Sequence, residues 1–462
     1  MSRMVFLLLV SFAFALATPE QNTARYFESI RKSPPQQLAF LLKMPKGGDL
    51  HNHLGGAVYA ESMVKWAAEK GLCVNVTMAL TQPPCDSTAR QVPAGNAFSN
   101  PILYRQIIDA WSMRSWEHSF QTGHDHFFDT FGKFGLATSG QTGRMLAELT
   151  SRAARGHVMY LELMQTLDEG LSSQIGKKTG SWDGDFAGTL SKLKSNGIMD
   201  AVKAGMQKVK DAEKEKDSLL QCGTAKADSG CFVTVRYLYQ VLREFPPEQV
   251  FAQISAGFLM AEQPDSKVVG LNLVQPEDGL NSMKNFSLHM RMLNFLRPIY
   301  PKAHISLHAG ELVPGLVPPE GLTFHIRESV LMGQAERIGH GVDIMHESDP
   351  YGLMKDMAKR HVIVEICLTS NDVILGVRKE QHPLATYMKY GVPVALATDD
   401  EGVSRSEMSM EYLKAAQDQG LGYVQLKEMA RNSLIHAFVS DGEKMRLEKK
   451  LEEDFRVFEK GY

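Results

Sequence analysis

Two histidines, His51 and His53, are the first residues of this sequence whose types and spacing could do chemistry. They are separated only by Asn52 and stand near the end of an apolar run, Gly48–Leu54. Side chains two residues apart in a strand point to the same side. If this run is a strand, both imidazoles can therefore reach one metal ion at its carboxyl end.

Two later runs supply further candidate metal ligands. The run His304–Gly310 contains His308, and the run Val392–Ala397 is followed after one residue by Asp399. Three neutral imidazoles and one carboxylate suit Zn²⁺ and leave one coordination position open for water. The sequence therefore predicts one zinc ion per chain, held by four ligands: His51, His53, His308 and Asp399.

His340 is a further candidate because it stands between two glycines, Gly339 and Gly341. Glycine lets a backbone or a ligand approach closely. By itself this pattern fits a structural histidine as well as a catalytic one. Next to a metal site we favour the catalytic interpretation.

These residues can meet only if the segments that carry them lie side by side. Eight apolar runs are expected to be strands: Gly48–Leu54, Val158–Met164, Phe232–Leu242, Val268–Val274, His304–Gly310, Arg337–Val342, Val362–Leu368 and Val392–Ala397. Several are continuously apolar, which is typical of parallel strands covered on both faces. Helical patterns separate them: Val58–Lys70, Gln141–Arg155, Asp200–Lys216, Pro247–Ala261, Ser282–Phe295, Pro350–Arg360 and Gln425–Phe438. This alternation predicts an α/β fold, a (β/α)₈ TIM barrel, whose enzymes place their chemistry at the carboxyl ends of the strands.

The 462 residues fit one barrel that carries extra segments. Residues 18–43 are expected to form a helical N-terminal arm, and residues 44–462 the barrel. Insertions are expected at about residues 72–100 and 218–230. The net charge of −3 gives no bulk attraction to nucleic acid or to an anionic membrane, so neither is expected as a partner.

Residues 1–17 have the organisation of a signal peptide. Arg3 is followed by the apolar run Met4–Phe14 and then by the small residues around Ala17. We expect cleavage before Thr18 and a secreted or periplasmic protein; an uncleaved anchor is the alternative. No later run reaches ~18 uninterrupted apolar residues, so no membrane span is expected in the mature form.

The five cysteines fit an exported protein. Cys73 and Cys85 bracket one polar stretch, and Cys222 and Cys231 bracket another. Each pair could close a short loop by a disulfide, which export makes chemically possible. Cys367 lies in an apolar run and is expected to be a buried free thiol.

Taken together, these motifs resemble the adenosine deaminase family of the metal-dependent amidohydrolase superfamily. The resemblance covers about Met44 to Phe438. It is carried by Met44-Pro45-Lys46, His51-Asn52-His53, His308-Ala309-Gly310-Glu311, Arg337-Ile338-Gly339-His340-Gly341 and Thr398-Asp399-Asp400. The signal peptide, the insertion after the first strand and the segment Phe120–Phe134 are similar to the secreted, growth-factor-related branch of that family, which also suggests a homodimer.

The resemblance implies zinc-dependent deamination of adenosine or a related purine nucleoside to an inosine-type product and ammonia. His51, His53, His308 and Asp399 would bind zinc, which can lower the pKa of its bound water to about 7. Glu311 would protonate a purine ring nitrogen, which requires a raised pKa. His340 would orient or deprotonate the water. Substrate contacts are implied for three residues: Asp400, Gln275 and Gly310.

Two positions depart from the family pattern. Gly55 stands where many members have an acidic residue that reads the 5′-hydroxyl of the sugar. Gln275 stands where a glycine usually contacts the purine. A group that reads a hydroxyl can discriminate strongly, so its absence changes selectivity. Either inserted residues read the sugar (Trp111, Trp116 and His126 are candidates, although each also fits a packing role) or the substrate is a modified adenosine.

Two other functions stay open at this point. One is a different hydrolase of the superfamily, acting on another cyclic amidine or amide. The other is a secreted signalling or binding protein with a vestigial site, against which the complete set of seven site residues argues: His51, His53, His308, Glu311, His340, Asp399 and Asp400.

Overall fold

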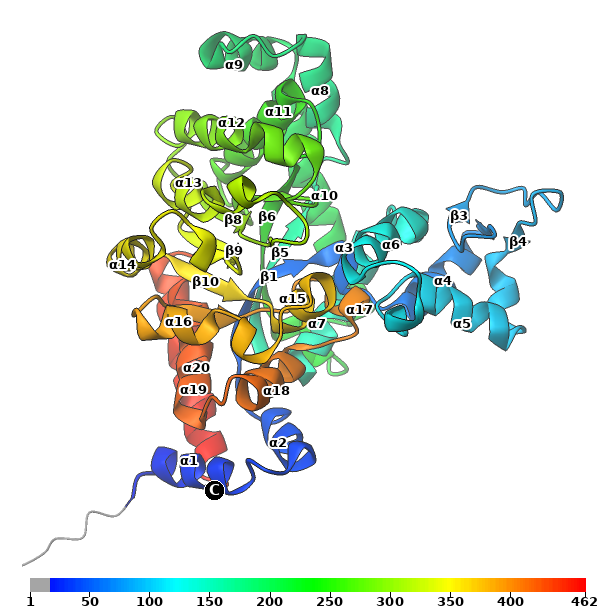
Figure 1. Ribbon diagram of the computed structural model, residues 1–462. Helices are drawn as coiled ribbons and strands as arrows, with labels where there is room; N and C mark the ends of the chain where they lie inside the picture. The colour runs from blue at the N-terminus through cyan, green and yellow to red at the C-terminus, as the bar shows by residue number, and fades with distance from the viewer. Residues whose placement is uncertain (1–16) are drawn as a thin grey trace, which may run out of the picture.

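The computed structural model describes residues 17–462 and contains a closed barrel of eight parallel strands (Figure 1). In chain order these are β1 (Gly47–His53), β5 (Val158–Gln165), β6 (Thr234–Leu242), β7 (Val268–Val274), β8 (His304–Ala309), β9 (Arg337–His340), β10 (Ile363–Ile366) and β11 (Val394–Leu396). Each pairs in parallel with the next. A bridge between Asn52 and Asp399 joins the last strand to the first. The predicted (β/α)₈ barrel is confirmed.

Several observed strands are shorter than the apolar runs that predicted them. β8 stops at Ala309 because Gly310 has a φ of +74°, and β9 stops at His340 because Gly341 has a φ of +58°. Such angles end an extended backbone and suit glycine, which has no Cβ. The two turns carry the chain outward at the carboxyl end of the barrel, immediately beside the predicted site residues.

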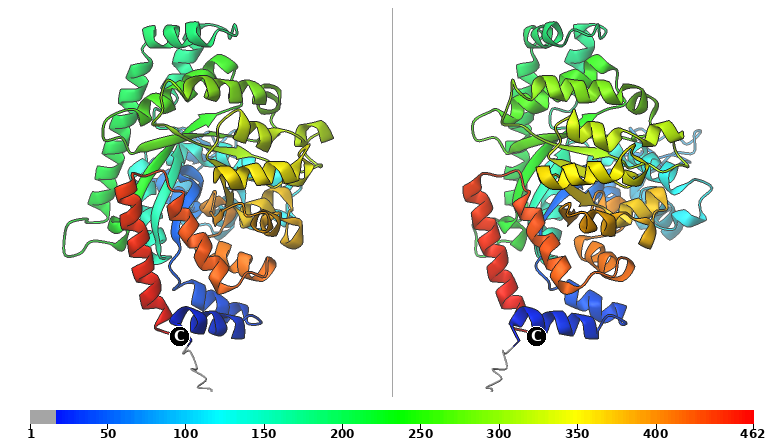
Figure 2. Two further views of the ribbon diagram at one scale, coloured as in Figure 1. Left: turned by 90° about the vertical axis from the view of Figure 1, so that its left-hand side faces the viewer. Right: turned by 60° about the vertical axis from the view of Figure 1, so that its left-hand side comes forward.

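Helices cover the outside of the barrel, as Figure 2 shows. They are α4 (Ala60–Glu69), α7 (Thr142–Arg155), α10 (Ile198–Leu219), α11 (Pro247–Ala261), α12 (Leu280–Leu296), α13 (His325–Leu331), α14 (Pro350–Arg360), α16 (Leu384–Lys389), α18 (Met408–Asp418) and α19 (Tyr423–Ile435). The predicted bounds of α11 and α14 agree with the structure at both ends. Both helices begin with a proline, whose fixed φ and missing N–H suit the first helical turn.

Two helices, α1 (Pro19–Ser29) and α2 (Pro34–Leu41), form the segment before the barrel. They lie against α18, α19 and the last helix, α20 (Asp441–Glu459). Phe40 contacts the rings of Phe27 and Phe458 at centroid distances of 4.9 and 5.0 Å. Behind them the buried Lys46 ammonium donates to the carbonyl groups of Leu41, Met44 and Gly156 at 2.6 to 2.9 Å, which offsets the cost of its burial.

Both predicted disulfides are present. Cys73 and Cys85 close a loop beside a small antiparallel sheet of β2 (Cys73–Val74), β3 (Leu80–Thr81) and β4 (Val92–Pro93), which projects from the barrel (Figure 1). Cys222 and Cys231 close the loop between α10 and β6. Cys367 is free and buried, as predicted.

The expected signal peptide falls almost wholly on residues 1–16, which lie outside the described part of the chain. Among residues 17–462, no helix combines the length and the apolar character needed to cross a bilayer.

Candidate active site

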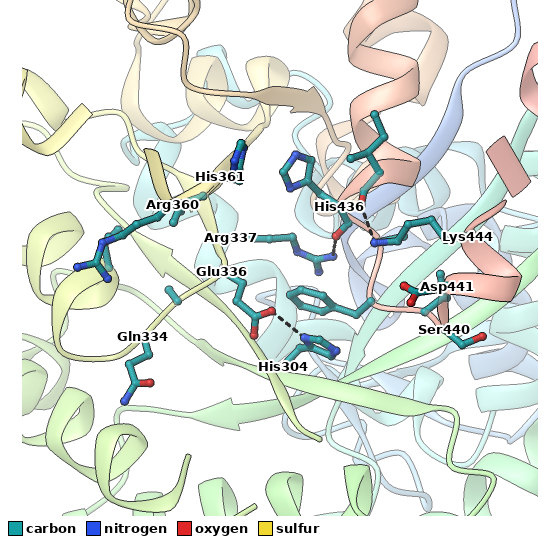
Figure 3. Close-up of a pocket in the computed structure, with 17 residues that line it drawn as sticks. His304, Gln334, Glu336, Arg337, Arg360, His361, His436, Ser440, Asp441 and Lys444 are labelled. Atoms are coloured by element: carbon teal, nitrogen blue, oxygen red, sulfur yellow. Dashed lines mark hydrogen bonds and ion pairs between the residues drawn. The ribbon is translucent and has the colours of Figure 1, made fainter. Parts of the chain in front are cut away.

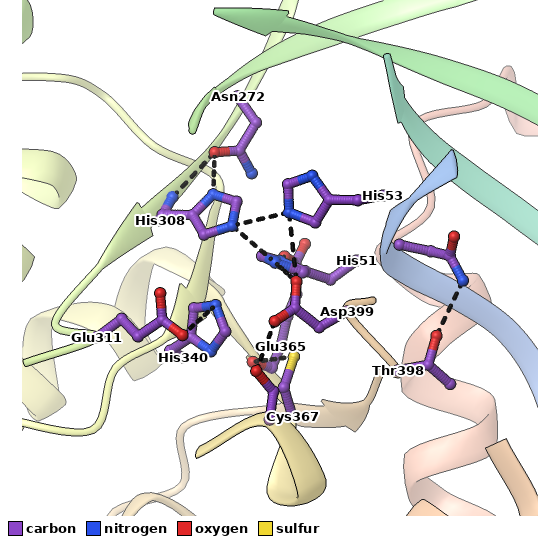
Figure 4. Close-up of polar contacts among 12 residues, drawn as sticks. His51, His53, Asn272, His308, Glu311, His340, Glu365, Cys367, Thr398 and Asp399 are labelled. Carbon is purple, nitrogen blue, oxygen red and sulfur yellow. Dashed lines mark hydrogen bonds and ion pairs between the residues drawn. The ribbon is translucent and has the colours of Figure 1, made fainter. Parts of the chain in front are cut away.

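The four predicted metal ligands meet at the carboxyl end of the barrel. His51 and His53 end β1, His308 lies near the end of β8, and Asp399 follows β11. Their ligand atoms all lie within 4.8 Å of one another (Figure 4). His308 Nε2 is 3.0 Å from His51 Nε2 and 3.2 Å from His53 Nε2. Asp399 Oδ1 is 3.4 and 3.3 Å from the same two histidine atoms.

The partners of these imidazoles show which nitrogens face inward as lone pairs. His51 Nδ1 lies 2.7 Å from the Glu365 carboxylate, and His308 Nδ1 lies 2.7 Å from Asn272 Oδ1. His53 Nδ1 lies 3.1 Å from Gln240 Oε1. Each of these oxygens accepts, so each Nδ1 carries a proton and each Nε2 is left to present a lone pair to a metal ion.

Three lone pairs at such distances repel one another unless a cation lies between them. Asp399 completes the set: Ser370 Oγ donates to its Oδ2 at 2.6 Å, while the buried Oδ1 has no hydrogen-bond partner. Two ligand atoms of a tetrahedral zinc site lie about 3.3 Å apart, because each is about 2 Å from the metal. The spacing and chemistry of the donors therefore fit Zn²⁺. Burial and the neighbouring imidazoles lower the pKa of His308, which favours its neutral, ligating form.

Glu311 and His340 lie beside this cluster. Glu311 Oε1 is 3.6 Å from His340 Nε2, and both atoms are buried without a hydrogen-bond partner. Burial, and then the charges of Asp399 and Glu277, raise the pKa of the Glu311 carboxyl well above its usual range. Glu277 also accepts from the backbone N–H groups of Gly310 and Glu311 at 3.1 and 2.8 Å, which holds the turn after β8 in place. This shift favours the protonated form of the Glu311 carboxyl.

A cavity of about 390 Å³ opens onto the cluster, a size typical of small-molecule sites. One wall is apolar and comes from α6 (Gly123–Thr138). The other walls carry polar groups. The cavity is lined by His53, Phe127, Phe128, Phe131, Gln240, Leu242, Val274, Gln275, Pro276, His308, Glu311, Asp399 and Asp400.

Two of the three predicted substrate contacts, Asp400 and Gln275, line this cavity. Burial raises the pKa of Asp400 to about 8, so its carboxyl can donate a hydrogen bond at neutral pH. Gln275 Oε1 accepts from the Glu244 N–H at 2.9 Å. Gly310 does not line the cavity, and a Cβ at Gly310 would lie 2.4 Å from Asp343 Oδ1. Its substrate contact stays a prediction.

The three residues suggested as readers of the sugar lie elsewhere. Trp111 is buried and its Nε1 donates to the carbonyl of Met78 at 2.7 Å. His126 is buried against the carbonyl oxygens of Asp109 and Ser112, both at 3.1 Å. Trp116 packs against the edge of the hydrophobic core. None of the three lines the cavity beside the metal ligands, and Trp116 and His126 line a different one.

The sequence interpretation missed the three acceptors behind the imidazoles: Gln240, Asn272 and Glu365. Each is a polar residue inside an apolar barrel strand, on β6, β7 and β10 respectively. A buried polar side chain needs a partner. An isolated polar residue in a continuously apolar strand is therefore the signal that could have found them.

A larger cavity, of about 760 Å³, lies at the opposite, amino end of the barrel (Figure 3). Its lining includes His304, Glu336, Arg337, Arg360, His436 and Lys444, and none of the predicted site residues. His304 Nδ1 is 2.8 Å from Glu336, and the buried Arg337 pairs with Glu162 and Glu365. His304, Glu336 and Arg337 thus each have an ion-pair partner.

Comparison with known proteins agrees with the fold. An Arabidopsis N6-mAMP deaminase has a TM-score of 0.57 and 20% sequence identity, with 90% of this chain and 99% of that chain covered. An amidohydrolase of Burkholderia ambifaria, solved with bound Zn, has a TM-score of 0.55 and 18% identity, with 91% and 93% covered. At these identities the likeness shows the barrel fold.

The structure is thus a (β/α)₈ barrel with a cluster of imidazole and carboxyl groups at its carboxyl end that could hold a metal ion. The model of one family, described as "Adenosine deaminase", matches residues 119–454. The chain belongs to the adenosine deaminase family. The adenosine deaminase of Salmonella heidelberg (strain SL476) is 40% identical over 149 residues, which are 32% of this chain and 41% of that protein. The chain thus matches about two fifths of the length of that relative.

Proposed function

We propose that this protein is a zinc-dependent deaminase of adenosine or a related purine nucleoside. The observation that carries the proposal is the convergence of three Nε2 atoms and the unpartnered Asp399 Oδ1 on one point, beside the buried and unpartnered Glu311. Family membership supports the reaction class. His51, His53, His308 and Asp399 would hold the metal, which supplies the positive charge that makes water a nucleophile at neutral pH.

The remaining residues of the site have separate roles in binding and protonating the purine. The Glu311 carboxyl donates its proton to the ring nitrogen next to the carbon that bears the amino group, so charge does not accumulate there. Asp400 donates a hydrogen bond to the ring nitrogen of the five-membered ring of the purine. The α6 wall of Phe127, Phe128 and Phe131 contacts the flat face of the base and excludes bulk water. Water adds its oxygen to the carbon; one of its protons restores the Glu311 carboxyl, the other leaves with the amino group as ammonia, and a carbonyl remains.

The proposal is tested on one preparation of the mature protein. Metal content is measured, and the ultraviolet spectrum is followed with adenosine, 2′-deoxyadenosine, 5′-modified adenosines and adenine. We expect one zinc per chain and a purine spectral change with at least one nucleoside. A preparation that contains zinc and releases ammonia only from non-purine cyclic amidines would instead show a different hydrolase.

We also propose that the protein is exported and that residues 1–17 are removed. The two disulfides support this, because such bonds persist mainly in oxidising compartments. N-terminal sequencing of the protein recovered outside the producing cytoplasm should begin at Thr18. A first residue of Met1 would contradict the cleavage.

A further inference from the structure

A line of buried polar side chains runs away from the active site behind His340. Asn371 lies on α15 (Leu368–Leu375), and His382 lies just before α16. Asn371 Nδ2 is 2.9 Å from His340 Nδ1, and Asn371 Oδ1 is 3.1 Å from His382 Nε2. At the far end the backbone N–H of Leu384 donates to His382 Nδ1 at 3.2 Å. The side chains of His340, Asn371 and His382 are all buried, so each of these hydrogen bonds is strong and a missing partner would be costly.

The contact at the far end fixes which group donates and which accepts in every hydrogen bond of this line. A backbone N–H can only donate, so His382 Nδ1 must present a lone pair to Leu384. Burial lowers the pKa of His382 to about 4, so at neutral pH the ring is uncharged and carries its single proton on Nε2. His382 Nε2–H therefore donates to Asn371 Oδ1.

The donor and acceptor roles of Asn371 then follow, and they fix the role of His340. With Oδ1 engaged by His382, the Asn371 amide must turn its Nδ2 toward His340, and an NH₂ group can only donate. His340 Nδ1 therefore accepts. An imidazolium, or a ring protonated at Nδ1, would set two N–H groups against each other at 2.9 Å. The proton of His340 consequently lies on Nε2, on the side of Glu311 and the metal ligands (Figure 4).

We propose that Asn371 and His382 are positioning residues that hold His340 in its Nε2–H form. A ring in this form has no lone pair on the side of Glu311 and the metal ligands. His340 therefore donates a hydrogen bond to an oxygen there and does not remove a proton from it. Of the two roles that the sequence left open, orienting or deprotonating water, this geometry selects the first. This last step rests on the proposed function, whereas the proton position does not.

Nuclear magnetic resonance tests the proton position directly. The zinc-loaded protein is labelled with ¹⁵N in its histidine rings, and two-bond ¹⁵N–¹H spectra distinguish the two neutral forms. His340→Gln identifies the signal. We expect a proton on His340 Nε2 in the wild type, and on Nδ1 in Asn371→Asp, because the new carboxylate accepts at the same place. A wild-type ring protonated at Nδ1 would overturn the proposal.

Kinetics test whether this proton position matters. Asn371→Asp should lower kcat by about 10²-fold or more, with KM changed less than about threefold and zinc content unchanged, as for a catalytic histidine in the wrong form. His382→Leu leaves Asn371 free to turn and should lower kcat by about tenfold. His382→Gln keeps an N–H donor near Nε2 and should restore most of it. His289→Leu, which removes a buried histidine that has no partner, is the matched control.

The possible failures can be told apart. If His382→Gln and His382→Leu lose the same activity, the role is structural and the positioning proposal is wrong. If the spectra show Nε2–H in the wild type but no nucleoside is deaminated, the proposed function fails and the proton position stands. If the spectra show Nδ1–H while adenosine is deaminated, the proton position is wrong and the proposed function stands.

Discussion

The two ends of the barrel differ in how their polar groups are used. The amino-end cavity is the larger, at about 760 Å³ against about 390 Å³, and it also holds histidines, arginine and lysine. Several of its polar groups have partners: His304 pairs with Glu336, Arg337 pairs with Glu162 and Glu365, and Lys444 donates to the carbonyl of Ile435. At the carboxyl end, buried atoms of Glu311, His340, Asp399 and Asp400 have no partner.

The end of the barrel that holds the candidate active site is therefore distinguished by buried polar atoms that lie close together without hydrogen-bond partners, and not by the size of its cavity. A buried polar atom without a partner costs free energy, so a fold keeps several of them together only where something else satisfies them. At the carboxyl end Glu311 and His340 stand at the turns that end β8 and β9, and Asp399 and Asp400 follow β11. The experiments below should affect the carboxyl end and spare the amino end.

Removal of a metal ligand should have the largest effect. His308→Ala and Asp399→Ala each delete a donor from the cluster, so zinc content should fall well below one per chain and turnover should fall to background. Metal analysis after gel filtration measures this. His304→Ala at the amino end is the matched control and should keep zinc and turnover within about twofold. Full zinc content in Asp399→Ala would remove that residue from the ligand set.

Replacement of the proton donor should come next. Glu311→Gln keeps the shape of the side chain but cannot transfer a proton, so kcat should fall by at least ~10²-fold while zinc stays bound. Steady-state rates and metal content on the same sample decide this. Near-normal turnover, or loss of zinc, would show that Glu311 has another role.

A smaller effect is expected from the acceptors behind the imidazoles. Gln240→Leu removes the partner of His53 Nδ1 and should weaken zinc binding by about 10–100-fold, as such supporting contacts usually do. Competition with a chelator measures the affinity. Gln240→Glu keeps an acceptor oxygen and should retain the wild-type affinity; equal weakening in both variants would point to packing instead.

The smallest effect concerns selectivity. Gly55 has open space where a Cβ would lie, so Gly55→Asp should fold normally. A carboxylate there can accept from a 5′-hydroxyl, and the preference for adenosine over 5′-deoxyadenosine in kcat/KM should rise about tenfold. An unchanged ratio would mean that the 5′-hydroxyl does not come near residue 55.

The barrel and its metal ligands could be predicted because both depend on local patterns. Continuous apolar runs such as Val268–Val274 identify buried strands, and the ends of parallel strands meet at one face. His51, His53, His308 and Asp399 stand at such ends, so their meeting follows from chain position. The ends of β8 and β9 could not be predicted in this way, because the turns at Gly310 and Gly341 depend on backbone angles.

The surroundings of the ligands could not be predicted in the same way. Trp111 and His126 were reasonable candidates for contacts with the sugar, yet both pack away from the cavity, whose apolar wall comes from Phe127, Phe128 and Phe131 of the same region. Which face a helix presents depends on how the whole insertion docks. A single sequence contains the side chains but not that docking angle.

The sequence by itself determined the kind of barrel, the residues at its carboxyl end and the metal that such donors prefer, because strand period and ligand chemistry are local properties. Only the tertiary structure decided which nitrogen of each histidine faces the site. That choice is made by Glu365, Asn272, Gln240 and Asn371, which contact the rings from other strands and from a helix. A proton position is set by its hydrogen-bond partner, and here every partner is distant in the chain.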